Sequence, residues 1–258
     1  MKKVRDCLWV WGHPEDSLYD WIGIPNKYVT PVESMRELGA TNIFFVPFGH
    51  PFDIIRYSKD TKGMAKIGLS VENWGDLGSN HLEKTLSLAP LFPQIDRVVY
   101  DDFFGEGESS YIRFSASYPI EELISERERI HKAGLEMWVV YYQSQLNMTV
   151  QPHMDVFDGV SFWFWNEPTP EQYREYSQMF LANTVGKKRL IGCYLYNFGL
   201  KQPALPECVE YQLDANLELL KSGEIEGIVL HNNVISGCNH PAYEAACKWV
   251  ETHGDKIV

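Results

Sequence analysis

The feature that most constrains the fold of this chain is a regular alternation of short apolar runs with longer amphipathic segments. The apolar runs, rich in β-branched and aromatic residues, are 7–11, 42–47, 67–72, 98–104, 136–142, 160–165, 189–196 and 227–231. Runs of this length that are apolar almost throughout are typical of strands buried on both faces of a parallel sheet. The segments that have helical patterns are 31–39, 51–59, 81–88, 119–132, 150–156, 170–181, 206–220 and 241–252.

Eight such units in succession predict a closed (β/α)8 TIM barrel. We expect a single catalytic domain over residues 1–258, because no shift in composition divides the chain. A doubly wound sheet is the main alternative fold. It usually has fewer strands and a glycine-rich first turn, and the chain contains neither a G-x-G-x-x-G motif nor a P-loop.

The charge of the chain narrows the classes of ligand. Lys and Arg number 23 against 35 Asp and Glu, a formal net charge of -12, which repels phosphate backbones and argues against nucleic acid. The five cysteines have no C-x-x-C spacing, which indicates neither a disulfide framework nor a zinc ribbon. We expect a small-molecule or oligosaccharide substrate and no cofactor or metal, and the oligomeric state stays open.

No segment reaches the length of a membrane span, and the N-terminus enters a strand-like run without an apolar signal core. We therefore expect no membrane association. The sequence as written predicts a cytoplasmic protein, or a secreted or periplasmic one if a leader has been removed.

In a barrel, the residues at the carboxyl ends of all the strands face one another across one mouth, where the active sites of such folds lie. The polar and aromatic residues at these ends are His13, Glu72, Asn73, Asp101, Asp102, Tyr141, Tyr142, Trp163, Trp165, Asn166, Tyr194, Tyr196, Asn197, His231, Asn232 and Asn233. Such a set favours hydrogen bonding and ring stacking on a flat polyhydroxylated ligand such as a sugar. As substrate-binding residues we select His13, Glu72, Tyr142, Trp163, Trp165, Tyr196, Asn197, His231 and Asn232.

Asp101 and Asp102 are the candidate catalytic pair. They follow the apolar run Val98-Val99-Tyr100 and precede two phenylalanines. Adjacent strand residues point to opposite sides, but at a strand end both side chains can reach the mouth. Two carboxyl groups held close together raise one pKa, so that one keeps a proton while the other stays ionised.

Tyr100-Asp101-Asp102 at the end of a fourth barrel strand resembles the Asp-Asp pair of the O-GlcNAcase-type β-N-acetylglucosaminidases, and more loosely the Asp-Glu pairs of the hexosaminidase and chitinase barrels. The resemblance implies a glycoside hydrolase that acts by substrate-assisted retaining hydrolysis. In that mechanism the 2-acetamido oxygen of the sugar attacks the anomeric carbon. Asp101 would polarise the acetamide, and Asp102 would be the general acid and base. The chain lacks the Asp-Gly-x-x-x-Asp-x-Glu motif of the chitinases.

Three other interpretations stay open. Asn166-Glu167-Pro168 matches the acid/base motif of a large clan of retaining glycosidases, but no partner glutamate follows on the last two strands. His13, Glu72, Asp102 and His231 are a possible metal set, as in sugar isomerases and aldolase-type barrels, although no H-x-H or H-E-x-x-H motif supports it. A barrel with the same aromatic residues and inert acids would be a non-catalytic sugar-binding protein.

Overall fold

The computed structural model describes residues 1–15, 29–47, 54–60, 65–72, 80–105, 115, 118–231 and 235–258, without the side chains of Ile54, Ser58 and Glu72. Within these ranges the barrel strands are β1 (Leu8–Gly12), β2 (Asn42–Phe45), β3 (Lys66–Glu72), β4 (Ile95–Tyr100), β5 (Glu136–Tyr142), β6 (Gly159–Trp163), β7 (Lys188–Tyr194) and β10 (Gly227–His231). All pair in parallel in chain order, and β10 pairs back to β1 to close the barrel. The predicted (β/α)8 barrel is confirmed.

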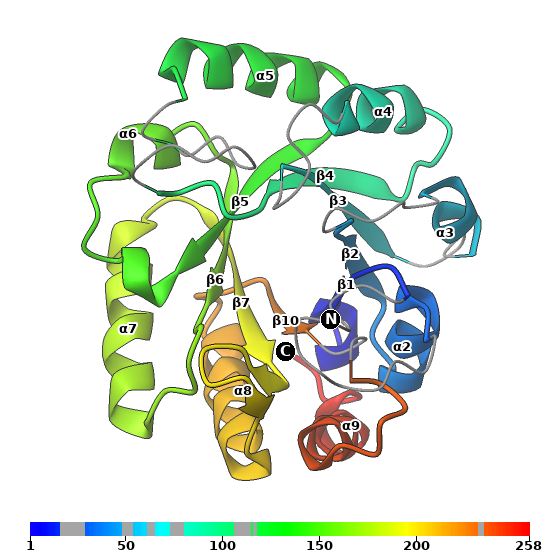
Figure 1. Ribbon diagram of the computed structural model, residues 1–258, viewed down its shortest axis with the longest axis vertical. Coiled ribbons are helices and arrows are strands. Elements are labelled where there is room, and N and C mark those ends of the chain that lie inside the picture. Colours follow the sequence, from blue (N-terminus) through cyan, green and yellow to red (C-terminus); the bar gives the residue numbers. More distant parts are fainter. Residues whose placement is uncertain are drawn as a thin grey trace.

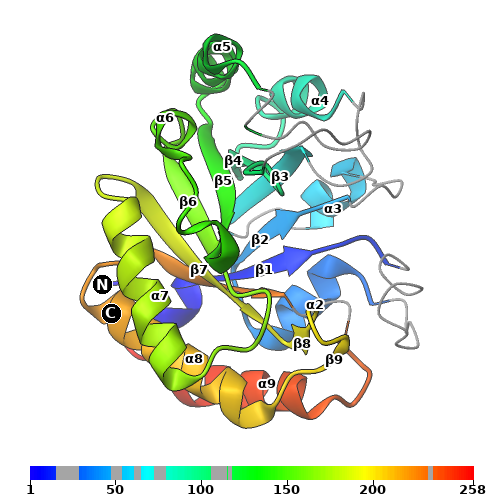
Figure 2. The same ribbon diagram turned by 60° about the vertical axis from the view of Figure 1, so that its left-hand side comes forward.

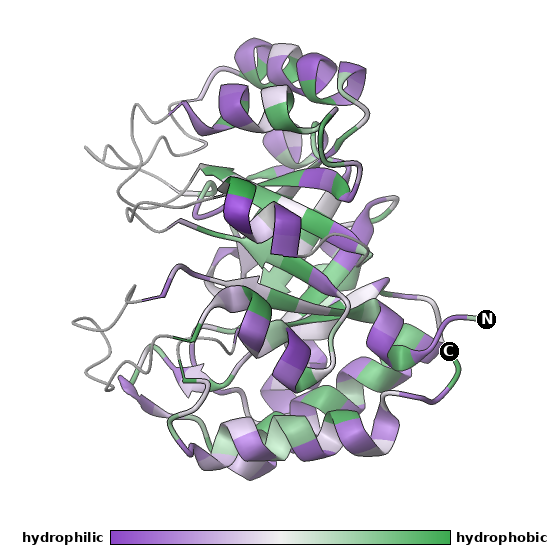
Figure 3. Ribbon diagram, turned by 90° about the vertical axis from the view of Figure 1, so that its right-hand side faces the viewer, coloured by the Kyte–Doolittle hydropathy of each residue, from purple (hydrophilic) through white to green (hydrophobic). Residues whose placement is uncertain are grey.

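Helices surround the closed sheet, as Figure 1 shows. They are α2 (Pro31–Leu38), α3 (Ile54–Asp60), α4 (His81–Leu88), α5 (Ile120–Lys132), α6 (Gln151–Met154), α7 (Pro170–Asn183), α8 (Pro206–Lys221) and α9 (Pro241–His253). The strands are largely hydrophobic and the helices mix hydrophobic with hydrophilic residues (Figure 3). This is the amphipathic pattern of a helix that buries one side only.

Local signals set the helix starts. Thr30 accepts a hydrogen bond from the backbone N–H of Glu33, whose side chain in turn accepts from the backbone of Thr30, and Pro31 opens α2. This capping box satisfies backbone donors that the first turn leaves unpaired. α2 ends at Gly39, whose φ of 75° is the left-handed conformation that glycine adopts readily.

The two-residue period of each strand divides the core into two layers. Outward-facing residues pack under the helices, and inward-facing residues fill the barrel. The inner cluster is Trp9, Trp11, Phe44, Val46, Val99, Trp138, Val140, Trp163, Leu190 and Val229. Three glycines make room for its largest rings. A Cβ at Gly68, Gly159 or Gly192 would lie 2.3, 2.4 or 2.1 Å from Phe44, Trp138 or Trp163 respectively.

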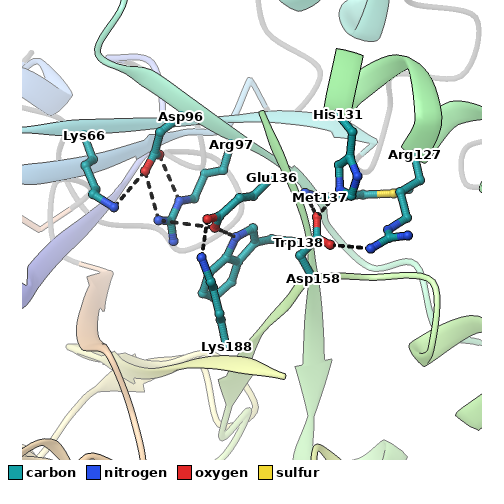
Figure 4. Close-up of polar contacts among 10 residues, drawn as sticks. All are labelled: Lys66, Asp96, Arg97, Arg127, His131, Glu136, Met137, Trp138, Asp158 and Lys188. Carbon is teal, nitrogen blue, oxygen red and sulfur yellow. Dashed lines mark hydrogen bonds and ion pairs between the residues drawn. The ribbon is translucent and has the colours of Figure 1, made fainter. Parts of the chain in front are cut away.

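The end of the barrel at which the strands begin is closed by an ion-pair network (Figure 4). The buried Arg97 guanidinium lies between the rings of Trp9 and Trp138, 4.4 and 4.3 Å from their centroids. Nε of Arg97 donates to Oδ1 of Asp96 at 2.9 Å, and Nη2 of Arg97 lies 3.7 Å from Oε2 of Glu136. The two carboxylates also pair with lysines from the first residues of β3 and β7, Lys66 and Lys188. The chain termini lie together at this same end, opposite to the point of the β1 arrow (Figure 2).

The predicted seventh strand is too long. β7 ends at Tyr194, and Tyr196–Asn197 forms a separate short strand, β8, which pairs antiparallel with β9 (Gln202–Pro203). The chain therefore leaves the barrel two residues earlier than the apolar run indicates. None of the described helices is long and apolar enough to cross a membrane.

Candidate functional site

A cavity of about 450 Å³, measured to its open mouth, lies at the carboxyl end of the barrel strands. Its lining residues are Trp11, His13, Asp101, Asp102, Val140, Tyr142, Trp163, Trp165, Tyr194, Phe198 and His231. All but Phe198 come from β1, β4, β5, β6, β7 and β10 or from the two residues directly after one of these strands.

Both candidate catalytic acids line this one cavity, and the backbone explains how adjacent residues do so. Asp101 continues the inward-facing series of Arg97 and Val99 on β4, so the strand period points it into the barrel. Asp102 would then point outward, but its φ of 54° is left-handed. The chain turns at this residue, and the second carboxyl group also reaches the cavity.

The surroundings of the two carboxyl groups favour one shared proton. Asp101 is 6% exposed. Burial, and then the charge of Asp102, raise its pKa well above the usual value, while the Asp102 backbone N–H and the Tyr142 hydroxyl oppose the shift. Burial also raises the pKa of Asp102. The Tyr142 hydroxyl donates to Oδ1 of Asp102 at 2.9 Å, which opposes that rise. These effects favour a single proton on the pair, and they raise the pKa of Asp101 the more.

Tyrosine hydroxyls beside the pair remain neutral donors. Burial raises the pKa of Tyr142 and Tyr194 well above the usual value, and the nearby aspartates raise it further. A phenol in this state can donate to a carboxylate or to a ligand oxygen, and it carries no charge at neutral pH.

A pair of buried histidines forms another wall. Nε2 of His13 lies 3.0 Å from Nε2 of His231, and Nδ1 of His13 lies 3.0 Å from the backbone oxygen of Val46. Burial and the neighbouring His13 lower the pKa of His231 well below the usual value, with its own backbone carbonyl opposing the shift. His231 is thus neutral at physiological pH.

Aromatic rings form the floor and sides of the cavity. Trp163 contacts Trp11 edge-on at 5.4 Å between centroids and Tyr194 at 4.7 Å. Higher up, Trp165 contacts Tyr142 at 6.0 Å and Phe198 at 5.8 Å. These rings present faces on which the apolar side of a sugar ring can stack.

The structure brings together seven of the predicted site residues: His13, Asp101, Asp102, Tyr142, Trp163, Trp165 and His231. Glu72 is the last residue of β3, but its side chain lies outside the described part of the structure, as does all of Asn232.

Tyr196 and Asn197 do not line the cavity. Tyr196 packs in the outer core against Phe198, and the Asn197 amide donates to Glu167 and accepts from the backbone of Leu200. Both were selected because the seventh strand was expected to reach Tyr196. The inward-facing residue of β7 that lines the cavity is Tyr194.

The selection also missed Trp11, Val140 and Phe198. For Trp11 and Val140 the strand period was the available signal, because each lies two residues before a selected residue, His13 or Tyr142, on the same face. Phe198 lies beyond β8, where no period applies.

Two of the alternative motifs can be compared with the structure. Glu167 of the Asn-Glu-Pro sequence accepts hydrogen bonds from the backbone of Leu205 and from Asn197, so it braces the β8–β9 hairpin. It is not among the residues that line the cavity. Among the described side chains, no cluster of three or more His, Cys, Asp or Glu is placed to hold a metal ion.

Comparison with known proteins identifies the fold and no family. No family model and no curated protein matches the chain. A tryptophan synthase α-subunit mutant from Pyrococcus furiosus is 14% identical, with 97% of this chain and 98% of that chain covered and a TM-score of 0.55. A probable 2-pyrone-4,6-dicarboxylic acid hydrolase from Acinetobacter baumannii, solved with citric acid bound, is 13% identical, with 96% and 91% covered and a TM-score of 0.57. A further match is the α2β2 tryptophan synthase complex from Pyrococcus furiosus, 13% identical, with 97% and 98% covered and a TM-score of 0.54. At these identities the likeness is one of barrel fold.

Proposed function

We propose that the protein is a glycoside hydrolase whose catalytic residues are Asp101 and Asp102. The observation that carries the proposal is that the two adjacent carboxyl groups line the same aromatic-walled cavity at the carboxyl end of the barrel. Their surroundings favour one proton on the pair. A neighbouring acid and anion are what glycoside hydrolysis requires.

The substrate-assisted retaining mechanism fits this pair better than a mechanism with a separate nucleophile. Adjacent residues on one strand act from the same side of a sugar, so the nucleophile must come from elsewhere, and a 2-acetamido oxygen supplies it. That oxygen attacks C1 as the bond from C1 to the leaving oxygen breaks. A water molecule then opens the cyclic intermediate at C1 and restores the acetamide with the configuration at C1 retained.

The two aspartates take different roles because their exposure differs. Asp102 is partly exposed at the turn after β4, and we assign the leaving group to this side, whereas Asp101 is buried. In the proposed complex the acetamide N–H donates to Asp101, which stabilises its ionised form and moves the shared proton to Asp102. Asp102 gives this proton to the leaving oxygen and later recovers one from the attacking water.

The decisive experiment measures hydrolysis of aryl glycosides, including the aryl N-acetylglucosaminide, by the wild type and two variants. Asp102→Asn should lower kcat by about 10²- to 10⁴-fold, the usual contribution of a general acid and base. Asparagine tolerates the left-handed backbone of residue 102, so the variant should fold. Asp101→Asn should slow the N-acetyl substrate and weaken binding of a thiazoline that mimics the cyclic intermediate. Asp155→Asn, on an exposed side chain, is the control.

Several outcomes contradict the proposal. Unchanged turnover by Asp102→Asn rules out the assigned acid. Sugar binding by the wild type with no turnover on any glycoside favours a sugar-binding protein, and loss of activity in EDTA favours a metal-dependent enzyme. If neither the Asp101 variant nor the thiazoline has the expected effect, the substrate-assisted form of the mechanism is wrong.

A further inference from the structure

A short 3-10 helix, Gln143–Gln145, directly follows β5 at the mouth of the barrel, and β5 lies between β4 and β6 in the sheet. The backbone pairing of β4 with β5 ends at Tyr100 and Val139. The turn that carries Asp101 and Asp102 starts at the next residue. Beyond the last paired residues, side chains of this short helix connect the ends of the neighbouring strands.

The amide of Gln145 joins the turn after β4 to β5. Its oxygen accepts from the backbone N–H of Tyr142 at 2.8 Å, and its nitrogen donates to the backbone oxygen of Phe104 at 2.6 Å. Because an N–H can only donate and a carbonyl can only accept, the two partners fix which end of the amide is oxygen. Gln145 is 9% exposed, and a buried backbone group that loses its partner costs free energy. The amide therefore takes the place that backbone hydrogen bonds have further down the two strands.

This amide bridge lies beside the contact between Tyr142 and Asp102. Asp102 is two residues before Phe104, and the Tyr142 hydroxyl donates to its Oδ1 at 2.9 Å between the same two segments. The turn is thus held to β5 at both ends. Tyr100 holds its start through the strand pairing, and Gln145 holds its end.

We propose that Gln145 is a positioning residue, whose amide holds the turn after β4 where the Tyr142 hydroxyl reaches the carboxyl group of Asp102. This inference rests on the proposed function for the role of Asp102 as the acid. Gln145 itself is not among the described residues that line the cavity. The Tyr142 hydroxyl opposes the rise in the pKa of Asp102, so loss of the Gln145 amide should raise that pKa further.

Gln143, on the same turn of helix, provides a matched control. Its amide oxygen accepts from the backbone N–H of Trp165 at 2.8 Å, so it joins β5 to the residues after β6. The turn that carries the two acids is on the other side of β5. Gln143→Met should therefore leave the titration of Asp102 as it is in the wild type.

The bridge is tested first in the wild type, by NMR on protein labelled with ¹⁵N-glutamine, with the signals assigned through bonds. The side-chain amide hydrogens of Gln145 should exchange with solvent more slowly than those of Gln178, which is exposed on α7. This measurement needs no variant to fold. Equal exchange rates would overturn the proposal.

The positioning role is tested by an NMR titration of Asp102 in protein that carries ¹³C at the aspartate carboxyl groups. Gln145→Met keeps an unbranched side chain of similar length and removes both hydrogen bonds, so the apparent pKa of Asp102 should rise, as in Tyr142→Phe. Gln145→Asn, whose amide is one methylene shorter and cannot span both partners, is the second variant and should give the same direction.

A double variant separates positioning from a general loosening of the mouth. In the Tyr142→Phe background, Gln145→Met should add no further rise, because the hydrogen bond through which it acts is already absent. The other described titratable groups that line the cavity are present in every variant, so they do not affect the comparison; they are Asp101, His13, Tyr194 and His231. An unchanged titration in Gln145→Met, the same rise in both backgrounds, or an equal rise in Gln143→Met would each overturn the proposal.

Kinetics on an aryl glycoside connect Gln145 to turnover. Gln145→Met should lower kcat by up to about 10²-fold, the cost of a misplacement of about 1 Å. Because exchange and titration are measured without turnover, failure of the hydrolase and failure of the bridge are distinguishable. The expected titrations in an inactive wild type would reject the hydrolase and keep the role of Gln145 at Asp102. An active wild type whose Asp102 titration ignores Gln145→Met would do the reverse.

Discussion

Tyr141 and Tyr142 are neighbours on β5 with opposite surroundings. The Tyr142 side chain points into the barrel, where its hydroxyl donates to Asp102 at 2.9 Å. The Tyr141 side chain points outward, and its hydroxyl donates to the backbone oxygen of Gln145 at 3.3 Å. The Tyr142 hydroxyl therefore lowers the pKa of a carboxyl group in the cavity, whereas the Tyr141 hydroxyl holds the loop that follows β5.

This difference supplies a matched test at the residue scale. In Tyr142→Phe the carboxylate of Asp102 loses a donor that lowers its pKa, so that pKa should rise. The pH dependence of kcat/KM for an aryl glycoside should then move to higher pH. Tyr141→Phe should keep the wild-type profile and lose about 1 kcal/mol of unfolding free energy, measured by urea denaturation. A shift of the profile in Tyr141→Phe alone would contradict the assignment.

Individual site residues were predictable as far as the strand period extends. His13, Asp101, Tyr142 and His231 lie in inward-facing positions that the sequence period specifies. Trp165 and Asp102 reach the cavity from turns just past the strands, so their prediction rested on closeness to a strand end. The end of β7 was not predictable, because Leu195 and Tyr196 are as apolar as the strand itself and remain buried outside it.

At the scale of the element, every barrel strand was predicted, because an apolar run marks a strand buried on both faces, but the run fixes the ends only in part: the run 98–104 passes the end of β4 at Tyr100. Glu136–Tyr142 and Gly227–His231 are strands over the predicted residues. The apolar runs do not show which small residue on one strand leaves space for a large ring on the neighbouring strand. Gly192 on β7 leaves the space that the Trp163 ring on β6 fills, and Gly159 on β6 does the same for Trp138 on β5.

Gly192→Ala and Gly159→Ala form a matched pair for this packing. Both add a methyl group against an indole ring, at 2.1 and 2.4 Å, and each should cost about 1–3 kcal/mol of unfolding free energy. Only Trp163 lines the cavity. Gly192→Ala should therefore weaken sugar binding in calorimetry as well, whereas Gly159→Ala should destabilise without a change in affinity. Equal loss of affinity in both variants would show that strand packing does not position the cavity floor.

At the scale of the whole molecule, the two ends of the barrel treat negative charge differently. At the end where the strands begin, Asp96 and Glu136 pair with Lys66, Arg97 and Lys188. At the mouth, the described cavity lining offers Asp101 and Asp102 no cation. The paired carboxylates at the first end contribute to stability. The two aspartates at the mouth reduce stability at neutral pH, because they are buried without a compensating cation, and the same burial keeps one of them protonated.

Stability should therefore respond in opposite directions to two similar substitutions. The pKa of Asp101 is higher in the folded protein than in the unfolded chain, where it is about 3.9. As pH rises from the unfolded value through the folded one, the unfolded chain ionises first, so the free energy of unfolding falls. Asp101→Asn removes this loss and should be more stable than the wild type at pH 7, with the difference vanishing near pH 3.

Asp96→Asn is the counterpart, because it removes a partner of the buried Arg97 and should lower the unfolding free energy at pH 7. Both are measured by urea denaturation across pH. Destabilisation by Asp101→Asn at neutral pH would mean that Asp101 is ionised and compensated in the folded protein.

The turn after β4 also restricts which acid can occupy the second place of the pair. Residue 102 has a φ of 54°, and aspartate, asparagine and glycine enter that region far more readily than residues with longer side chains. Glutamate, the acid with the longer reach, is poorly suited to this position. The left-handed backbone at residue 102 thus favours the shorter acidic side chain, aspartate. A variant that needs glutamate at this position requires a different backbone conformation in the turn.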